Sequence, residues 1–419
     1  MTESMFTPSD TAPWYREISA KQWYALLAGQ LGWALDAFDV MLYSFCLTSI
    51  MAEWKLKPAE AGFMVTVTLF ASSFGGILFG AVADRVGRKK ALMATVLLFS
   101  ICSGLSGIAQ SLAQLAIART LLGLGMGGEW ASGALLVSET WPAQHRGKAI
   151  GLMQGGWAIG YIAAAIVAAT ILPWLGWRAM FFVGIAPALF TLWIRRKVDE
   201  PAIWVEARAK GVTGRPGASL LRLFDRSLVR YTVLCTLTSA FVMFAYWGLF
   251  SWMPGFLAQP VNQGGAGLGI AKAPIWIIPM MVGALIGYVT FGFIADRVGR
   301  RPTFAAYLVI SAILVWIFGR THDATQLMLL GPLVGFFGSG YFSLFGAFIA
   351  ELFPTAARGS AVGFCYNAGR MLSALAPTLI GSLSTTYGLG GALTFLAIAF
   401  LGGAITIFFL PETRGRELS

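Results

Sequence analysis

The chain has 419 residues, of which 57% are hydrophobic and only 12% are charged, and its mean hydropathy is +0.72. One soluble core with a solvated surface cannot accommodate this composition, which therefore excludes a soluble globular protein and predicts a membrane protein. The net charge of +11 is expected to contact anionic lipid rather than nucleic acid, because no soluble basic domain is available to hold a duplex.

Apolar runs of about 20 residues, the length of helix that crosses a bilayer, recur along the whole chain. In chain order, the twelve predicted transmembrane helices span 22–48, 60–83, 91–109, 113–137, 148–171, 176–194, 231–257, 273–294, 303–319, 326–349, 360–383 and 391–410. Residues 1–21 are polar and contain no apolar stretch followed by a cleavage site. We therefore expect no removable signal peptide, and we expect the first helix to direct insertion.

The basic residues predict the orientation. With the N-terminus in the cytoplasm, 23 of the 30 Lys and Arg residues fall on cytoplasmic segments, five on the opposite side and two, Arg119 and Arg370, within helices. Because basic residues concentrate on the cytoplasmic side, both termini are expected inside, at a bacterial inner membrane. The four cysteines and two histidines are scattered singly, so we expect neither a disulfide framework nor a metal site.

Two motifs occur twice at the same spacing. "ADRVGRKK" at 83–90 returns as "ADRVGRRP" at 295–302, and "SETWPAQHRGKAIG" at 138–151 returns as "AELFPTAARGSAVG" at 350–363. The step from position 83 to 295 equals the step from 138 to 350, and we call it the repeat offset. A shared offset indicates two homologous halves, so the predicted fold is an all-α membrane protein with twelve transmembrane helices in two pseudo-symmetric six-helix bundles. The expected parts are a cytoplasmic segment (1–21), a first bundle (22–194), a cytoplasmic linker (195–229), a second bundle (230–410) and a cytoplasmic tail (411–419).

The loop "GAVADRVGRKK" between the second and third predicted helices resembles the signature loop of the major facilitator superfamily. The resemblance covers essentially the whole chain and implies a cytoplasmic gate latch that breaks and re-forms during transport. The residues assigned to it are Asp84, Arg85, Gly87, Arg88, Glu139 and Arg146 in the first half and Asp296, Arg297, Arg300, Glu351 and Arg358 in the second. The alternative is a positively charged turn, with Glu139 and Glu351 in simple ion pairs with Arg146 and Arg358.

Two longer segments, "ARTLLGLGMGGEWASGALLVSETWPAQHRGKAIG" and "GWRAMFFVGIAPALFTLWIRRKVDEPAIW", are similar to the branch of this superfamily that contains sialic acid, lactate and aromatic acid proton symporters. That branch implies inward, proton-coupled uptake of an organic anion, with the proton as coupling ion and no other cofactor. It does not name the anion.

Asp36 and Asp39 lie in an otherwise apolar stretch of the first helix, and Tyr43 follows on the same helical face. A charge at the bilayer centre costs about 2.5–3.5 kcal/mol, so these acids should face a watery cavity or a cation. The candidate cation is Arg119 in the fourth helix, at the depth of Asp39. In related sugar symporters an acid at the corresponding place faces such an arginine, and we therefore predict that Asp39 carries the proton.

Alternatives remain open for each of these acids. Asp39 and Arg119 could form a static pair, and Asp36 could be a second proton site, a modulator of Asp39 or a partner in orienting the substrate. Glu129, which follows a run of glycines in "LGMGGEWASG", is a further candidate for proton coupling. It could instead cap or pair near the cytoplasmic half of its helix.

Arg370 lies near mid-membrane in the eleventh helix. A guanidinium group binds a carboxylate in a bidentate manner, so Arg370 is the predicted ligand of the substrate's anionic group. The alternative is a structural tie between Arg370 and Asp36 or Glu129. The remaining predicted substrate-binding residues are Asn367, Tyr366, Tyr43, Gln154 and Trp157. Four further aromatic residues lie on helices expected to line the cavity: Trp33, Tyr246, Trp247 and Tyr341. Each of these aromatic residues could equally pack in the core.

Three functions compete for this sequence. The favoured one is a proton symporter that imports a small organic carboxylate, such as a lactate-like monocarboxylate, sialic acid, or an aromatic or muconate-type acid. The second is an organic-anion exchanger or exporter on the same fold. The third, a membrane receptor or enzyme, lacks a signalling domain, a nucleophile–histidine pair and a nucleotide-binding loop in this sequence. One chain is expected to enclose a complete pathway and to function as a monomer.

Overall fold

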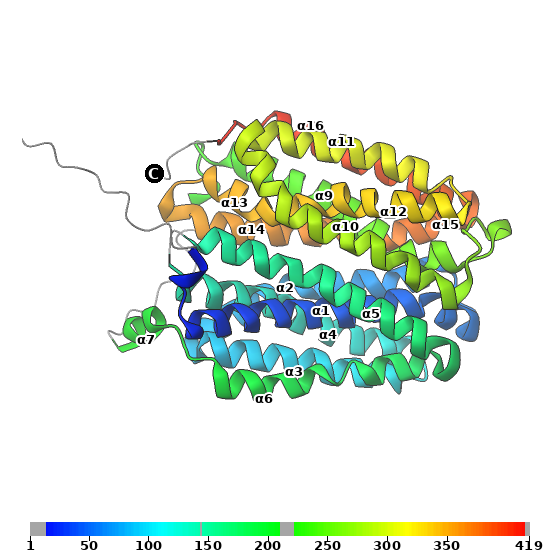
Figure 1. The fold of residues 1–419 in the computed structure, drawn as a ribbon, viewed down its shortest axis with the longest axis horizontal. Coiled ribbons are helices and arrows are strands. Elements are labelled where there is room, and N and C mark those ends of the chain that lie inside the picture. Colours follow the sequence, from blue (N-terminus) through cyan, green and yellow to red (C-terminus); the bar gives the residue numbers. More distant parts are fainter. Residues whose placement is uncertain (1–13, 143–144, 210–221, 415–419) are drawn as a thin grey trace, which may run out of the picture.

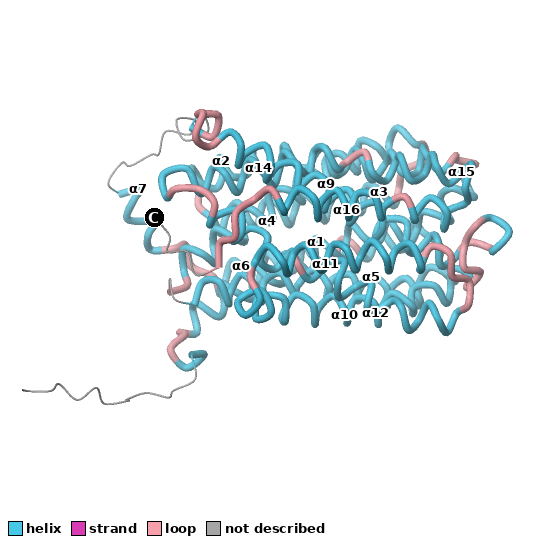
Figure 2. The backbone as a smooth tube through the Cα atoms, turned by 90° about the horizontal axis from the view of Figure 1, so that it is seen from above, coloured by secondary structure: helices cyan, strands magenta, loops and turns pink. Residues whose placement is uncertain are grey.

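The computed structural model describes residues 14–142, 145–209 and 222–414, and these residues form helices and loops without strands. The first half contains α1 (Ala20–Trp54), α2 (Pro58–Val86), α3 (Arg88–Gly107), α4 (Leu112–Thr140), α5 (Arg146–Val183), α6 (Pro187–Lys197) and the short α7 (Ala202–Ala209). The second half contains α9 (Val229–Ala258), α10 (Gly269–Val298), α11 (Arg300–Phe318), α12 (Ala324–Gly340), α13 (Phe342–Glu351), α14 (Thr355–Ser373), α15 (Ala376–Thr394) and α16 (Leu396–Phe408). The long helices run along one axis, and most connecting loops gather at its two ends (Figure 1, Figure 2).

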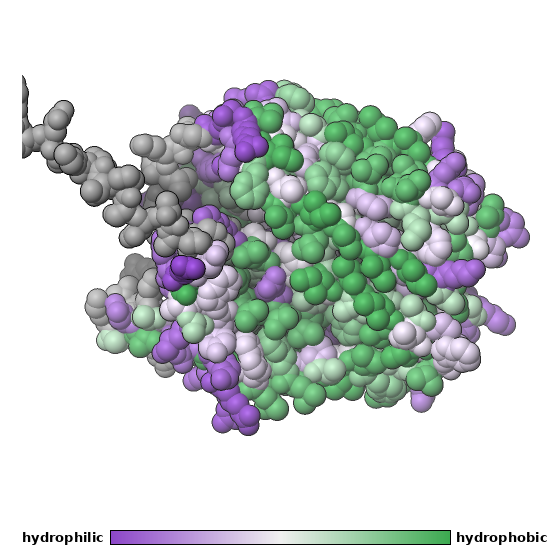
Figure 3. Space-filling view, viewed as in Figure 1, coloured by the Kyte–Doolittle hydropathy of each residue, from purple (hydrophilic) through white to green (hydrophobic). Residues whose placement is uncertain are grey.

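We call the end where α1 begins and where the described chain stops the terminal end, and the opposite end the far end (Figure 1). Polar side chains concentrate at these two ends, and a broad apolar surface covers the helices between them (Figure 3). Large apolar side chains such as Leu189, Phe293 and Leu329 point outward over this surface, each about 70% exposed. Such a surface is suited to lipid rather than water.

The twelve predicted crossings are all present. Eight helical stretches of the described residues are long and apolar enough to cross a membrane, and a bent pair, 357–394 with 396–408, makes a ninth. Two of these nine stretches reverse at a glycine with positive φ, Gly176 (74°) and Gly388 (70°), so each holds two crossings. The last crossing is α4, whose hydropathy is lowered by Arg119 and Glu129. The twelve-helix fold is therefore confirmed.

Some predicted helices are interrupted. The predicted helix 326–349 is divided at Tyr341 into α12 and α13, directly after Gly338 and Gly340, which are poor helix formers. The predicted helix 360–383 is divided before Ala376, because Pro377 has no N–H to continue the hydrogen-bond pattern of α14. These breaks lie inside the membrane region and let each helix change direction between the two ends.

The repeat seen in the sequence returns in the backbone. Gly176 and Gly388 are separated by the repeat offset, and so are Gly87 (φ 109°) and Gly299 (φ 121°), which form the sharp turns between α2 and α3 and between α10 and α11. Positive φ values are accessible mainly to glycine. Four glycines at one spacing thus set the same turns in both halves.

The two halves touch through equivalent helices. Within the first half α1 packs against α5 and α2 against α4, and within the second α10 packs against α12 and α9 against α14. Between the halves α5 packs against α10 and α2 against α15. Because α10 corresponds to α2, and α14 with α15 corresponds to α5, these are two copies of one contact, as a pseudo-twofold axis requires.

The halves pack closely toward the far end and more loosely toward the terminal end. Near the far end, Thr66 of α2 donates a hydrogen bond to the carbonyl of Ala374 (2.6 Å), and Gly62 lies directly against Pro377. Nearer the terminal end, no atom of the described residues lies within 4 Å of the position that a Cβ would take at Gly80, Gly151, Gly292 or Gly363. These four glycines form two pairs at the repeat offset, on the helices that join the halves. The halves are therefore packed more loosely at the terminal end than at the far end.

Close helix contact within the first half depends on glycine. A Cβ at Gly127 of α4 would overlap the Ser72 carbonyl of α2, whereas a Cβ at Gly292 of α10 meets nothing. We predict that Gly127→Val lowers the stability by about 1–3 kcal/mol, the usual cost of overpacking, and that Gly292→Val changes it much less. Thermal unfolding of the two purified variants in detergent checks this. Equal midpoints would contradict the close packing of α2 on α4.

Candidate functional site

A cavity lies between the two halves. The unfilled space there, including the part that is open to solvent, is about 380 Å³, and it is lined by Trp33, Gln154 and Trp157 from the first half and by Met243, Tyr246, Trp247, Tyr288, Phe342, Tyr366 and Arg370 from the second. Seven of these ten side chains are aromatic, and Arg370 is the one that carries a charge. The cavity is thus suited to a small apolar or flat molecule with an anionic group.

Arg370 is positioned by α14 at the wall of this cavity. Its side chain is 2% exposed, and its guanidinium group lies 4.9 Å from the centre of the Tyr366 ring. Its Nε has no hydrogen-bond partner among the described residues. A buried guanidinium group with an unused donor beside an aromatic cavity is able to bind a carboxylate.

Trp130 of α4 closes one side of the cavity together with Tyr366. The two rings stack with their centres 4.9 Å apart and an interplanar angle of 5°, and the Trp130 indole N–H donates to Gln154 Oε1 (3.4 Å). Both residues lie nearer the terminal end than Arg370 does. Sequence reasoning missed Trp130, although it directly follows Glu129 in a motif that was singled out. Tyr366, one of the predicted substrate-binding residues, presents its ring face to Trp130.

Several other aromatic predictions can now be placed. Trp157 lines the cavity, and its indole N–H donates to the Tyr246 hydroxyl across the two halves (2.5 Å). Trp33, whose indole nitrogen has no partner among the described residues, packs against Trp157. Tyr341, in contrast, is completely buried beside Phe342 and is not part of the cavity wall.

Two predicted substrate ligands lie elsewhere. The Tyr43 hydroxyl donates to the carbonyl of Ala61 (2.9 Å), which ties α1 to α2, and the Tyr43 ring supports Arg119 at 5.0 Å. The Asn367 amide donates to the carbonyl of Gly363 within α14 (2.9 Å). Neither side chain lines the cavity. A role of Tyr43 and Asn367 in substrate binding therefore stays a prediction, and in this structure their side chains are used for contacts with Ala61 and Gly363.

Asp39 and Arg119 are buried together behind the cavity. Ser103 of α3 donates a hydrogen bond to one Asp39 oxygen, and the other oxygen has no partner among the described residues. Arg119 is 1% exposed, and its Nε and one terminal nitrogen are also unpartnered among these residues. The expected direct ion pair is therefore absent between these two described residues, and Arg119 instead faces the rings of Tyr43 and Phe181. Ser103 was not predicted.

Both buried arginines, Arg370 and Arg119, act electrostatically on Asp36. It is completely buried, and neither of its oxygens has a hydrogen-bond partner among the described residues. Its electrostatic attraction to Arg370 is stronger than that to Arg119. Asp36 is thus connected to the cavity through Arg370, whereas Asp39 is held by Ser103 one turn farther along α1.

The predicted latch residues form ion pairs at the terminal end, with partners other than those expected. Arg88 binds Glu139 through two hydrogen bonds (2.9 and 2.8 Å). In the second half, Arg300 contacts both Asp296 and Glu351 (3.5 Å to the latter). The step from Arg88 to Arg300 is the repeat offset, as is that from Glu139 to Glu351, so the same pair occurs twice.

The expected pair of Glu139 with Arg146 involves a side chain outside the described residues and stays a prediction. The Nε of Arg358 donates to the carbonyl of Ala350 (3.0 Å), and Glu351 accepts a hydrogen bond from Thr413. The side chains of Asp84 and Arg146 lie outside the described residues. Arg85 is at the exposed end of α2 and Arg297 at that of α10.

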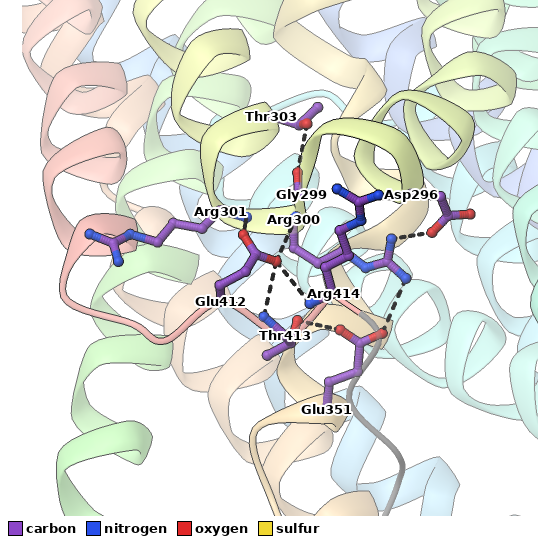
Figure 4. Close-up of polar contacts among 9 residues, drawn as sticks. All are labelled: Asp296, Gly299, Arg300, Arg301, Thr303, Glu351, Glu412, Thr413 and Arg414. Carbon is purple, nitrogen blue, oxygen red and sulfur yellow. Dashed lines mark hydrogen bonds and ion pairs between the residues drawn. The ribbon is translucent and has the colours of Figure 1, made fainter.

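Two further acids complete these clusters and were not predicted. Glu412 accepts hydrogen bonds from the backbone N–H groups of Arg300 (2.8 Å) and Arg301 (3.0 Å) at the start of α11 (Figure 4). Glu200 accepts from the N–H of Lys89 (3.2 Å) at the start of α3. Glu200 and Glu412 are also separated by the repeat offset, so the spacing of the repeat could have revealed them. Both carboxylates face the positive end of a helix.

Backbone hydrogen bonds control the ionisation of Glu412. Partial burial raises its pKa, but N–H groups of Arg414, Arg300, Arg301 and Thr413 stabilise the carboxylate, and the pKa ends below its usual value. A group with a lowered pKa in the folded state stabilises the protein above its unfolded pKa, and this contribution is lost as the pH falls through the folded value.

We predict that Glu412→Gln lowers the stability at pH 7 by about 0.5–1 kcal/mol, the lower part of the range for a helix cap because the side chain is exposed. The difference from wild type should shrink as the pH falls below about 4. Thermal unfolding at pH 7 and at acidic pH measures it. Glu206→Gln on the exposed face of α7 is the matched control, and an equal loss at both pH values in Glu412→Gln would contradict a role of its charge.

The comparison with known proteins agrees with this architecture. The model of the major facilitator superfamily matches residues 31–289 and 275–418. A probable 4-methylmuconolactone transporter of Cupriavidus pinatubonensis is 38% identical over 96% of this chain and 93% of its own length. A cis,cis-muconate transport protein of Acinetobacter baylyi is 32% identical over 93% of this chain and 94% of its own.

A solved structure supports the fold. The inward open xylose transporter of Escherichia coli superimposes with a TM-score of 0.76 over 95% of this chain and 98% of its own, at 22% sequence identity. The matching family model, the two relatives and the paired bundles around a central cavity lead to one conclusion. This chain belongs to the major facilitator superfamily, in the branch of organic-anion transporters, and is a membrane transporter rather than an enzyme.

Proposed function

We propose that the protein imports a small organic carboxylate together with protons by alternating access. The observation that carries this proposal is Arg370, a buried cation with an unused donor in the wall of a cavity between two bundles. The terminal end, which carries most of the basic residues, is the cytoplasmic side. The looser packing of the halves at that end then marks the side on which substrate leaves for the cytoplasm, once the Trp130–Tyr366 stack opens.

The cavity favours a flat, unsaturated acid. Its wall is largely aromatic, and one of its indole N–H groups, that of Trp157, is already bound to Tyr246. Aromatic rings bind planar groups by stacking, whereas a polyhydroxylated acid such as sialic acid would leave many hydroxyl groups unpaired. The relatives named for muconate and 4-methylmuconolactone support this choice. Lactate and sialic acid are the less favoured substrates.

Proton binding at Asp36 and Asp39 couples the gradient to substrate binding. While Asp36 is charged it attracts Arg370 and competes with an incoming carboxylate. A proton that neutralises Asp36 or Asp39 weakens this competition and releases the guanidinium group for the substrate. Arg119, held by Tyr43, supplies the positive charge that keeps the acids ionised once the substrate has left.

Asp39→Asn tests proton coupling. This variant keeps the size of the side chain and the Ser103 contact but cannot exchange a proton. We predict that, in proteoliposomes, it loses uptake driven by an imposed pH gradient and keeps counterflow exchange of the same carboxylate. If Asp39→Asn still accumulated substrate against its gradient, Asp39 would not carry the proton. If the wild type exchanged anions without responding to a pH gradient, the protein would be an exchanger.

Arg370→Lys tests substrate binding. The change keeps the positive charge but removes the planar pair of donors, so we predict that carboxylate affinity falls by about 1.5–3 kcal/mol. Arg370→Ala should weaken binding further. Calorimetric titration of the folded variants measures the affinity, with Arg320→Lys at the exposed far end as the control. Unchanged affinity in folded Arg370→Ala protein would remove Arg370 from the site.

A further inference from the structure

Glu129 is a third buried acid that neither the fold nor the substrate cavity explains. It lies on α4 against α1, where a Cβ added to Gly32 would overlap its carboxyl group. The side chain is completely buried, and neither oxygen has a hydrogen-bond partner among the described residues. A carboxylate left without a partner in such a place is costly, so its presence calls for a functional reason.

The surroundings of Glu129 offer it no counter-ion among the described residues. Its Oε1 lies beside the Cβ positions of Gly32 on α1 and Gly133 on α4, and the other side chains at these two positions, Leu92 of α3 and Met153 of α5, are apolar. Among the described titratable residues, Asp36 is the one whose charge acts on Glu129. The Asp36 and Glu129 carboxylates repel each other when both are charged. Protonation of one of them therefore favours ionisation of the other.

The three acids are ordered along α1. Gly32, which marks the level of Glu129, lies four residues before Asp36 and seven before Asp39. At 1.5 Å per residue these positions span about 10 Å along the helix. Because α1 starts at the terminal end, the order from the far end to the terminal end is Asp39, Asp36 and Glu129. Glu129 is therefore the acid of this group nearest the proposed cytoplasmic side.

The second half shows that the fold does not require an acid here. The residue at the repeat offset from Glu129 is Tyr341, which is completely buried and neutral. The equivalent ion pairs at the terminal end, Arg88 with Glu139 and Arg300 with Glu351, are in contrast present in both halves. A residue needed only for packing would be expected to follow the repeat, so the acid at 129 is specific to the half that holds the proton-binding pair.

We propose that Glu129 accepts the proton from Asp36 and releases it to the cytoplasm, an inference that rests on the proposed proton symport. In this step the O–H bond of protonated Asp36 breaks and an O–H bond forms at the Glu129 carboxylate. Asp36 becomes an anion, attracts Arg370 again and prevents the released substrate carboxylate from binding again. Glu129 then loses its proton on the terminal side. Release of substrate and release of proton are thereby linked.

Glu129→Gln in proteoliposomes tests this relay. The variant should exchange substrate by counterflow at the wild-type rate, since Arg370 and Asp36 are intact. Its uptake under an imposed pH gradient should fall at least about tenfold, as expected when a proton-transfer group is removed, and should no longer depend on the internal pH. Glu60→Gln, on the exposed far-end turn of α2, is the matched control and should behave as wild type.

Two outcomes would overturn the relay. One is gradient-driven uptake in Glu129→Gln with the wild-type rate and the wild-type dependence on internal pH. The other is a loss of counterflow together with a lowered melting temperature, which would make Glu129 a structural residue. Glu129→Asp guards against misfolding of the amide variant, because it keeps a titratable group and should retain uptake with a shifted dependence on internal pH. A wild type without proton coupling would refute the proposed function itself, independently of Glu129.

Discussion

The central constraint on this protein is the cost of charge inside the membrane. Asp36, Asp39, Glu129, Arg119 and Arg370 are all buried at the level of the apolar surface, and each has at least one polar atom without a hydrogen-bond partner among the described residues. A fold selected for stability alone would replace these groups with apolar ones. These groups are arranged so that both arginines lie near the same pair of acids. This arrangement couples proton binding at the acids to anion binding at Arg370.

Symmetry and asymmetry are distributed differently along the membrane axis. At the terminal end the two halves repeat each other closely, with Glu200 and Glu412 at equivalent helix starts and with equivalent arginine–glutamate pairs. In the middle they differ, because the first half supplies the acids and the second half supplies Arg370 and most of the aromatic wall. The repeated ends are suited to a motion common to both bundles. The unequal middle is suited to binding two different ions.

The fold could be predicted from sequence because its signals are local or repeated. Runs of apolar residues mark the crossings, and the repeat offset identifies two halves. The turns at Gly176 and Gly388, which also lie at the repeat offset, were found only in the structure. The burial of Arg370 and of the acids followed from their place within apolar helices.

Which neighbour each side chain contacts did not follow from the sequence, because it depends on helix rotation and on the path of the turns. Glu139 therefore binds Arg88, which was not its expected partner, and Tyr43 contacts α2 rather than the cavity. Trp130 was missed because its stacking partner, Tyr366, lies in the other half of the chain.

The claim that binding depends on an ionised carboxylate can be measured directly on the wild-type protein. Thermal unfolding is followed with benzoate, muconate, lactate and sialic acid, and with the uncharged amide of each acid at the same concentrations. A ligand that binds the folded state raises the melting temperature by mass action. Recognition of the anionic group by Arg370 predicts that a flat acid raises it in a concentration-dependent way and that the matching amide does not. Equal stabilisation by acid and amide would contradict that recognition.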